Sequence, residues 1–506
     1  MVRMTKMPIK LFKKTSRRIV SSLILNLSLS LIFIVALYKI YFIEYYNSMS
    51  PFGKFITKNV DKDSSSSARE NNNTTKQKKN VIRNNNNNKF KEDLNLYPTL
   101  NHYYNQYGIE IEEFQLETKD GFIIDLWHLK SKTNFQCQNN IGQNSPVLMI
   151  HGLLQSSGSF ASNGQNSLAY YMFNSGFDVW LGNNRCGFTP NWNPKLIPKK
   201  KRWDWDINEM VNYDLPMLID HVLKVTNFEK LSIVCHSQGT TQVFLNLLQD
   251  KGKDKNCAPM IDKIENVIAL APALYPGPIL NDHPIFKLMS MAIDSPVVFG
   301  EKNFINIMMV ARKLFLGTAF FGFICYTIFN YLFGWNDLLW DDGLKNRHFQ
   351  FSPVFVSVKL MQWWISRDPN KKSFIKNYND FFPQYKKWFS KLGDDDTKQK
   401  IIPNFLIFIP GQDKLVDGQR VIKHFRNFEN EASYKIWYIE EYSHVDILWA
   451  NDVLEKVGRP ILQNMRLSHI NNNNSVPSTA SATATATAAV SPPASQHLKE
   501  SHDKLN

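Results

Sequence analysis

Short apolar runs alternate with stretches of helical periodicity along most of the chain. Runs of strand character lie at 109–118, 122–129, 147–150, 177–181, 231–234, 267–270, 405–409 and 434–439. The first two are joined by Lys119, Asp120 and Gly121, which predicts a hairpin. Helical spacing of apolar residues is found at 166–174, 207–225, 241–248 and 419–428. Strands that alternate with helices indicate the α/β class, with a mostly parallel sheet covered on both faces.

The alternation is interrupted between residues 275 and 400. This stretch is rich in Phe, Trp and Met. We expect it to form a large cap inserted into an α/β body that occupies residues 93–468. Within the cap, residues 314–335 form a run of 22 residues without a charge, which by length alone could span a bilayer.

The two ends of the chain differ from this body. Residues 19–38 form an uncharged run of 20 residues, preceded by seven basic residues in the segment 1–18. As a helix rising about 1.5 Å per residue, this run would cross a hydrocarbon core of about 30 Å. We interpret it as a transmembrane anchor rather than a cleaved signal peptide or a soluble core helix. The polar compositions of 39–92 and 469–506 predict a disordered spacer and a disordered tail.

Charge is distributed unevenly along the sequence. The formal net charge is +14, but residues 1–92 hold 18 Lys and Arg against 5 Asp and Glu, whereas the other 414 residues hold 41 against 40. The body is therefore nearly neutral, which argues against binding to nucleic acid. The five cysteines are scattered and odd in number, which argues against a disulfide framework or a zinc site.

The candidate chemistry is centred on Ser237. This serine stands in the stretch V-C-H-S-Q-G-T at 234–240, after a strand pattern and before a helical one. Such a context is typical of a nucleophile elbow, whose signature G-x-S-x-G has Cys235 at its first position here. The turn would expose the hydroxyl for attack on an ester carbonyl, and the Gln238 N–H would face the charge that develops.

A second segment, M-I-H-G-L-L-Q-S at 149–156, directly follows a candidate strand. Gly152 would let the backbone turn so that the Leu153 N–H faces the same point as the Gln238 N–H. We therefore expect the N–H groups of Leu153 and Gln238 to form an oxyanion hole. The alternative for the segment at 149–156 is an ordinary glycine turn without a catalytic role.

Two further segments supply a carboxylate and an imidazole. Asp413 and Asp417 both follow the same candidate strand. We favour Asp413 as the residue that orients the base because it is nearer the strand end, whereas Asp417 suits the cap of the next helix. His444 follows the last strand and is the candidate general base. The order Ser237, Asp413, His444 is that of α/β-hydrolases.

Several stretches of the chain, over roughly 97–465, resemble the acid lipase family, which includes gastric and lysosomal lipases and fungal steryl ester hydrolases. The similar motifs are H-G-L-L-Q-S-S at 151–157, D-V-W-L-G-N-N-R at 178–185, Y-D-L-P at 213–216, H-S-Q-G-T-T at 236–241 and Y-S-H-V-D-I-L-W-A at 442–450. The anchor and L-F-G-W at 332–335 are most similar to the membrane-bound fungal enzymes. The resemblance implies an α/β-hydrolase fold with Ser237 as nucleophile, His444 as base, Asp413 as its orienter, and Leu153 and Gln238 as oxyanion donors.

The resemblance departs from the family pattern at three places. These are Cys235 for a glycine, N-R-C-G at 184–187 for the family's N-x-R-G-N, and Gly411–Gln412 where a double glycine is common. The second departure puts the packing of its loop in doubt, and none of the three removes a catalytic side chain.

A lipid substrate follows from the cap and from the resemblance. A single bilayer crossing by 314–335 would separate Ser237 from Asp413 and His444, so we expect this segment to be a lid, a pocket wall or a membrane-dipping element, with ordinary cap core as the alternative. Steryl esters are the leading substrate, chiefly from the resemblance, and triacylglycerol is the second. The alternative outside the enzymes is a non-catalytic membrane scaffold that binds lipid and has the same fold. The chemistry requires no metal and no organic cofactor.

The expected setting is a membrane or a lipid-droplet surface. Basic residues before the anchor favour a cytosolic N-terminus and a body on the far side of the plasma membrane or endoplasmic reticulum. Asn72 and Asn73 begin N-x-T sequons that could then carry glycans. Contact with stored neutral lipid from the cytosol would instead place the body on the near side, so the sequence leaves the sidedness open.

Overall fold

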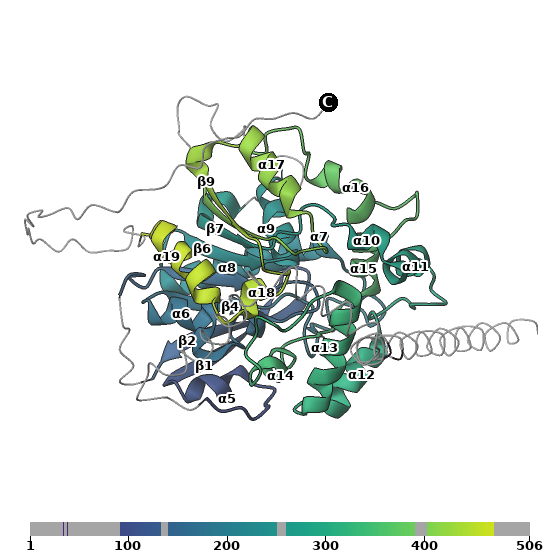
Figure 1. The fold of residues 1–506 in the computed structure, drawn as a ribbon, viewed down its shortest axis with the longest axis horizontal. Helices are drawn as coiled ribbons and strands as arrows, with labels where there is room; N and C mark the ends of the chain where they lie inside the picture. Colours follow the sequence, from purple (N-terminus) through teal and green to yellow (C-terminus); the bar gives the residue numbers. More distant parts are fainter. Residues whose placement is uncertain are drawn as a thin grey trace, which may run out of the picture. The chain divides into compact units, whose positions relative to one another are not determined.

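The centre of the molecule is a nine-stranded sheet, seen in a computed structural model that describes residues 34, 38, 92–132, 140–249, 260–389 and 402–469 (Figure 1). Its order is β1-β2-β4-β3-β6-β7-β8-β9, and β5 pairs with β2. The strand β2 runs antiparallel to its neighbours, and β3, β4 and β6 to β9 run parallel. The strands are β1 (Ile109–Glu117), β2 (Phe122–Ser131), β3 (Pro146–Ile150), β4 (Asp178–Gly182), β5 (Asn191–Trp192), β6 (Leu231–His236), β7 (Ile264–Leu270), β8 (Asn404–Pro410) and β9 (Tyr434–Ile439).

The burial of the strands explains why their sequences are apolar runs. Every residue of β3, β6 and β8 is buried, as expected for parallel strands covered on both faces. Along β3, Leu148 and Ile150 belong to one hydrophobic core, and Val147 and Met149 belong to the other. Since successive side chains point to opposite faces, each face of the sheet has its own core. The predicted α/β class is confirmed.

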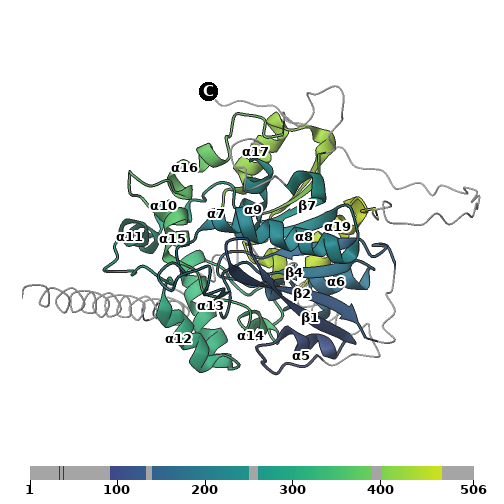
Figure 2. The same ribbon diagram turned by 180° about the vertical axis from the view of Figure 1, so that it is seen from behind.

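Helices cover both faces, as Figures 1 and 2 show from opposite sides. The first core includes residues of α8 (Leu215–Thr226), α9 (Gln238–Leu247) and α17 (Gly418–Phe428). The second includes residues of α6 (Leu168–Asn174) and α19 (Arg459–Asn464). The helix expected at 207–225 is composite, because a π-helical turn at Met210–Asp214 separates α7 (Ile207–Glu209) from α8.

Between β7 and β8 the described chain forms helices and contributes no strand to the sheet. We call these helices, α10 to α16, the cap helices (teal to green in Figure 1). They are α10 (Ile279–Asp282), α11 (Pro284–Ala292), α12 (Asn306–Phe315), α13 (Ala319–Phe333), α14 (Lys345–His348), α15 (Val358–Ile365) and α16 (Phe374–Phe381).

The uncharged run 314–335 is divided between two helices. The helix α12 ends at Phe315, and Gly317 has a positive φ of 83°. The next helix, α13, begins after Thr318, whose side chain accepts a hydrogen bond from the Phe321 N–H, and it ends before Gly334 in the left-handed conformation. At about 1.5 Å per residue, the 15 residues of α13 are too short to cross a hydrocarbon core of about 30 Å.

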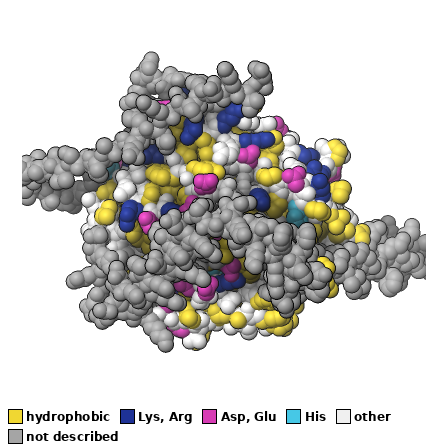
Figure 3. Space-filling model, in the orientation of Figure 1, with side chains coloured by type: hydrophobic (Ala, Val, Ile, Leu, Met, Phe, Trp, Pro, Cys, Tyr) yellow, Lys and Arg dark blue, Asp and Glu magenta, His cyan; other side chains and the backbone are white. Residues whose placement is uncertain are grey.

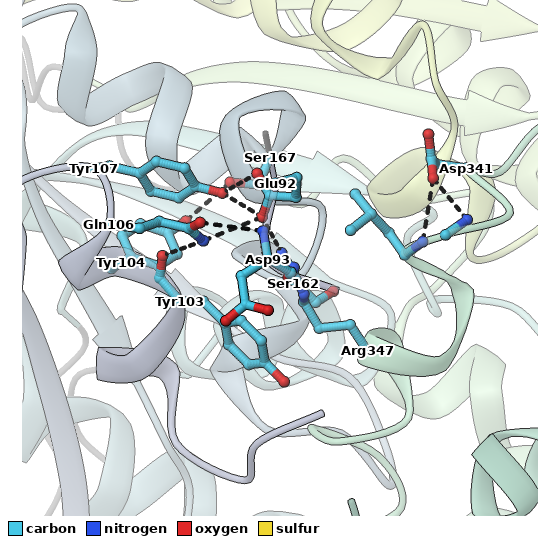
Figure 4. A network of polar contacts seen from close by, with 12 residues as sticks. Glu92, Asp93, Tyr103, Tyr104, Gln106, Tyr107, Ser162, Ser167, Asp341 and Arg347 are labelled. Atoms are coloured by element: carbon cyan, nitrogen blue, oxygen red, sulfur yellow. Dashed lines mark hydrogen bonds and ion pairs between the residues drawn. The ribbon is translucent and has the colours of Figure 1, made fainter. Parts of the chain in front are cut away.

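The start of the body is tied to the cap by a buried arginine (Figure 4). The Arg347 guanidinium on α14 forms an ion pair with Glu92 at 2.5 Å and donates to the Asp93 carbonyl. It also lies over the Tyr103 ring, 4.2 Å from its centroid. Tyr107 donates its hydroxyl to Glu92, so one carboxylate joins α5 (Leu100–Asn105) and its following turn to the cap.

Several predicted segments lie outside the described residues. The basic segment 1–18, the spacer up to residue 91 and the tail from 470 belong to this group, as does the anchor at 19–38 apart from Ile34 and Tyr38. In the ranges that the structure describes, no helix has both the length and the apolar character that a membrane crossing requires.

Candidate active site

Ser237 occupies a strained turn between β6 and α9. Its backbone has φ 52° and ψ −116°, a sparsely populated conformation for a residue with a side chain. The Ser237 N–H donates to the Leu270 carbonyl at 3.0 Å, which fixes the turn against β7. A Cβ on Gly239 would come within 2.5 Å of the Ile150 carbonyl oxygen, so only glycine lets α9 approach β3 this closely. Cys235 is accommodated at the first position of the signature, with its sulfur 3.5 Å from the Ile268 carbonyl oxygen.

The structure brings Ser237, His444 and Asp413 together in one chain of hydrogen bonds. The Ser237 Oγ lies 2.9 Å from His444 Nε2, and His444 Nδ1 lies 2.6 Å from Asp413 Oδ2. The other carboxylate oxygen of Asp413 accepts from the N–H groups of Leu415 at 2.8 Å and Val416 at 3.2 Å. Since an ionised carboxylate only accepts, the imidazole proton belongs on Nδ1, and Nε2 is free to accept the proton of the Ser237 hydroxyl.

Asp417, the alternative carboxylate, is engaged elsewhere. Its Oδ1 accepts from the Arg420 N–H at 3.1 Å, and its Oδ2 pairs with the Arg420 guanidinium at 3.0 Å. It therefore caps the N-terminus of α17, and its carboxylate has no hydrogen bond to His444.

The two expected oxyanion donors lie beside the serine. Gln238 is the first residue of α9, a position whose N–H has no acceptor within the helix. Among the described residues, neither the Leu153 N–H nor the Gln238 N–H has a hydrogen-bond acceptor. A Cβ on Gly152 would lie 3.1 Å from the Ser237 Cβ, so the turn that carries Leu153 packs directly against the serine.

His151 holds this turn in place. The Asn184 N–H donates to His151 Nε2 at 3.2 Å, which leaves the proton on Nδ1 to be donated to the Gly152 carbonyl at 2.8 Å. Burial lowers the pKa of His151 to about 4, so the ring stays neutral. In a trans peptide the C=O and the next N–H point in opposite directions, so this bond directs the Leu153 N–H away from His151.

His236 connects the turn that carries Ser237 to the loop that carries His444. One ring nitrogen lies 3.2 Å from the His444 carbonyl oxygen, and the other lies 3.0 Å from Gln155 Oε1. Burial, together with the nearby His444, holds the pKa of His236 well below its ordinary value of 6.5. A neutral ring at this position keeps a second positive charge away from the imidazolium that His444 would become.

Three tryptophans of the cap region contact the site. The Trp364 indole N–H donates to Gln238 Oε1 at 2.9 Å. The Trp340 indole N–H donates to Asp446 Oδ1 at 2.7 Å, two residues after His444. The Trp335 ring stacks on His444, with centroids 5.6 Å apart and planes 11° apart. These contacts escaped the sequence analysis, because no spacing along the chain connects the cap with the loops of the sheet.

Asp446 is buried and uses both of its oxygens. Besides Trp340, it accepts from the Ser443 N–H at 2.6 Å, so it fixes the loop that carries His444. Burial raises the pKa of this carboxyl, and the two donated hydrogen bonds oppose the rise.

Ser237 and His444 open into a cavity of about 370 Å³, within the range of small-molecule sites. No lysine, arginine, aspartate or glutamate is among the described residues that line it. Much of one wall is a single face of α13, formed by Phe321, Ile324, Cys325, Ile328, Phe329, Leu332 and Phe333. The arrangement can therefore place an activated hydroxyl at the edge of an apolar space.

No group of three or more His, Cys, Asp or Glu side chains in the described ranges is arranged to hold a metal ion. The cysteines Cys186, Cys235 and Cys325 are free and buried, whereas Cys137 and Cys257 lie outside those ranges. Burial raises the pKa of the Cys325 thiol to about 12, so this cavity-lining sulfur stays protonated.

Comparison with known proteins gives the chain its family. Residues 100–164 match the partial alpha/beta-hydrolase lipase region, and residues 145–303 match the alpha/beta hydrolase fold. Sterol esterase 2 of Saccharomyces cerevisiae is 51% identical over 394 residues, which cover 74% of this chain and 73% of that protein. Probable lipase C1672.09 of Schizosaccharomyces pombe is 27% identical, covering 72% of this chain and 75% of that protein. Gastric triacylglycerol lipase of Mus musculus is 28% identical, covering 71% and 89%. The chain therefore belongs to the lipase family of α/β-hydrolases and is a carboxylic ester hydrolase.

Proposed function

We propose that this enzyme hydrolyses steryl esters to a sterol and a fatty acid, with Ser237, His444 and Asp413 as its catalytic residues. The observation that carries the proposal is the hydrogen-bond chain from the Ser237 Oγ through His444 to Asp413, at the edge of an apolar cavity. The similarity to Sterol esterase 2 supports the choice of substrate.

The reaction proceeds in two halves. His444 Nε2 removes the proton of the Ser237 hydroxyl while Oγ attacks the acyl carbonyl, and the resulting oxyanion accepts hydrogen bonds from the N–H groups of Leu153 and Gln238. The tetrahedral intermediate collapses, and the alcohol leaves with the proton from His444 Nε2. In the second half, water gives a proton to the same nitrogen and attacks the acyl carbon. The new tetrahedral intermediate collapses, the fatty acid is released, and Ser237 Oγ leaves with that proton from His444 Nε2, which restores both side chains.

The groups of this site contribute to the reaction rate in different ways. Positioned proton transfer by a residue such as His444 contributes about 10²- to 10⁴-fold in rate. One oxyanion donor contributes about 10²- to 10³-fold. Asp413 fixes the tautomer of His444 and stabilises the imidazolium that forms during each half-reaction.

The surface of the cap supports contact with a lipid phase, where such an ester would be dissolved. Large apolar side chains are exposed on α11, α12 and α13, including Leu288 (61%), Met291 (68%), Leu314 (68%) and Phe320 (50%). Hydrophobic side chains gather at the lower right of Figure 3, where Figure 1 places the junction of α12 and α13. An exposed patch of this kind marks an interaction surface. The membrane anchor at 19–38 stays a prediction.

The test is hydrolysis of cholesteryl oleate by the full-length protein in detergent micelles, with triolein as the competing substrate class. We expect oleate release from cholesteryl oleate to be the faster reaction and to fall to background in Ser237→Ala. Equal or faster release from triolein would overturn the choice of steryl esters. A wild-type protein that resists a serine-directed fluorophosphonate probe would overturn the catalytic role of Ser237.

A further inference from the structure

The aromatic wall beside His444 is the part of the cavity best placed to select the substrate. Trp335 stacks on His444 and also on Phe333, whose ring centroid is 4.3 Å away with the planes 16° apart. Phe329 packs edge-on against Trp335 at 5.7 Å. All three aromatic side chains line the cavity, so they form one continuous apolar surface that begins at the imidazole.

The local backbone holds Trp335 firmly. Gly334 ends α13 with a φ of 70°, which turns the chain sharply enough to bring the next residue back onto the site. Asn330 fixes both sides of this turn, because its carbonyl accepts from the Gly334 N–H at 2.8 Å and its side-chain amide donates to the Trp335 carbonyl at 2.6 Å. The wall is therefore preorganised rather than adaptable.

The chemistry of the triad decides which half of an ester meets this wall. The alcohol oxygen must receive its proton from His444 Nε2, so the alcohol leaves on the His444 side of the tetrahedral centre. The oxyanion points instead toward the N–H groups of Leu153 and Gln238. The Trp364 indole contacts the side chain of Gln238, whereas the Trp335 ring stacks on His444, so of these two tryptophans it is Trp335 that packs on the imidazole beside which the alcohol leaves.

We propose that Trp335, together with Phe333 and Phe329, forms the subsite for the alcohol half of the ester and selects a flat polycyclic alcohol such as a sterol. A rigid ring system gains contact area against a preformed aromatic wall at little cost in conformational entropy, whereas a glycerol backbone with two more acyl chains cannot lie flat on it. This inference rests on the proposed function and adds the residues that determine its specificity.

The test compares two esters with the same acyl chain and different alcohols. Cholesteryl oleate and ethyl oleate are assayed in detergent micelles with full-length wild type, Trp335→Ala, Trp335→Phe and Phe304→Ala. Phe304 is the matched control, because it lines the same cavity but its ring packs on Phe299. Labelling by a fluorophosphonate probe shows that each variant keeps an assembled site.

We expect Trp335→Ala to lower kcat/KM for cholesteryl oleate at least about tenfold more than for ethyl oleate. Trp335→Phe should retain more of the preference for cholesteryl oleate over ethyl oleate. Phe304→Ala should change kcat/KM for both esters by similar factors. If Trp335→Ala lowered kcat/KM equally for the two esters, the subsite would be overturned. A shift in the acid limb of the pH profile would likewise overturn it, because it would show that Trp335 acts through the protonation of His444 and not through the alcohol. A wild type that cleaves ethyl oleate but not cholesteryl oleate would overturn both the subsite and the steryl substrate.

Discussion

Replacing Asp413 with asparagine should abolish most of the activity while leaving the fold intact. The Oδ1 position of Asp413 accepts two backbone N–H groups, those of Leu415 and Val416. An asparagine NH₂ placed there would face two donors, so the amide must turn its oxygen to them and its NH₂ to His444 Nδ1. That nitrogen then has to accept, and the imidazole proton moves to Nε2. In this tautomer Nε2 donates, and it cannot take the proton of Ser237.

The size of the effect follows from the function that is lost. General-base catalysis contributes about 10²- to 10⁴-fold, and the asparagine also removes the charge that stabilises the imidazolium. We therefore expect kcat to fall by about 10³-fold, which corresponds to about 4 kcal/mol in the activation free energy. KM should change little, because Asp413 does not line the cavity.

The matched control is Asp417→Asn, four residues along the same loop. Asparagine caps a helix about as well as aspartate, so only the partly exposed ion pair with Arg420 is lost, worth at most about 0.5 kcal/mol of stability. Its kcat should equal that of wild type within about twofold. The assay is steady-state hydrolysis of p-nitrophenyl butyrate with thermal melting of each protein. An Asp413→Asn protein that melts like wild type and keeps more than about a tenth of its kcat would refute the reasoning.

Two further predictions concern stability. In Asp446→Asn, the side-chain NH₂ would face one of the two donors that the buried carboxylate accepts from, the Trp340 indole N–H and the Ser443 N–H. The free energy of unfolding in urea should therefore fall by about 1–3 kcal/mol, and an unchanged urea midpoint would contradict this. Acidification should also destabilise the fold, because burial lowers the pKa of His151 to about 4 and of His348 to about 3. In the unfolded chain both histidines bind a proton from about pH 6.5 downward, whereas in the folded protein they stay neutral. The stability that the two neutral rings contribute is therefore fully present above that pH and is lost as the pH falls toward 4 and 3. Melting temperatures at pH 7.5, 5.5 and 4.5 should fall in that order, and a constant value would be inconsistent with buried neutral histidines.

The placement of the candidate site could be predicted because of a general property of parallel sheets. The carboxyl ends of parallel strands meet at one edge, so residues just after β3, β6, β8 and β9 converge although they are far apart in sequence. Apolar runs identify such strands, and the residues that follow them are then candidates for chemistry. The choice between Asp413 and Asp417 followed from the same rule, since the nearer residue to the strand end meets the histidine.

The cap could not be predicted in the same way. Its helices were visible only as a region without alternation, because an apolar residue on a cap helix has the same pattern whether it lines a cavity, packs in a core or faces a lipid. The uncharged run 314–335 shows this ambiguity, since only the three-dimensional arrangement divides it into α12 and α13 and turns one face of α13 toward the cavity.

The cap contacts have a consequence for how catalysis and specificity are divided in this fold. The edge of the sheet supplies the groups that we propose break the ester, whereas Trp335, Trp340 and Trp364 contact this region from the cap through a ring stack and two indole hydrogen bonds. Each tryptophan contacts a different part of the candidate site: His444, the loop that follows His444 and the side chain of Gln238. A displacement of the cap would therefore break contacts with the candidate catalytic groups as well as change the shape of the cavity. Binding in the cavity and the geometry of the reacting groups are thus coupled through the same three side chains.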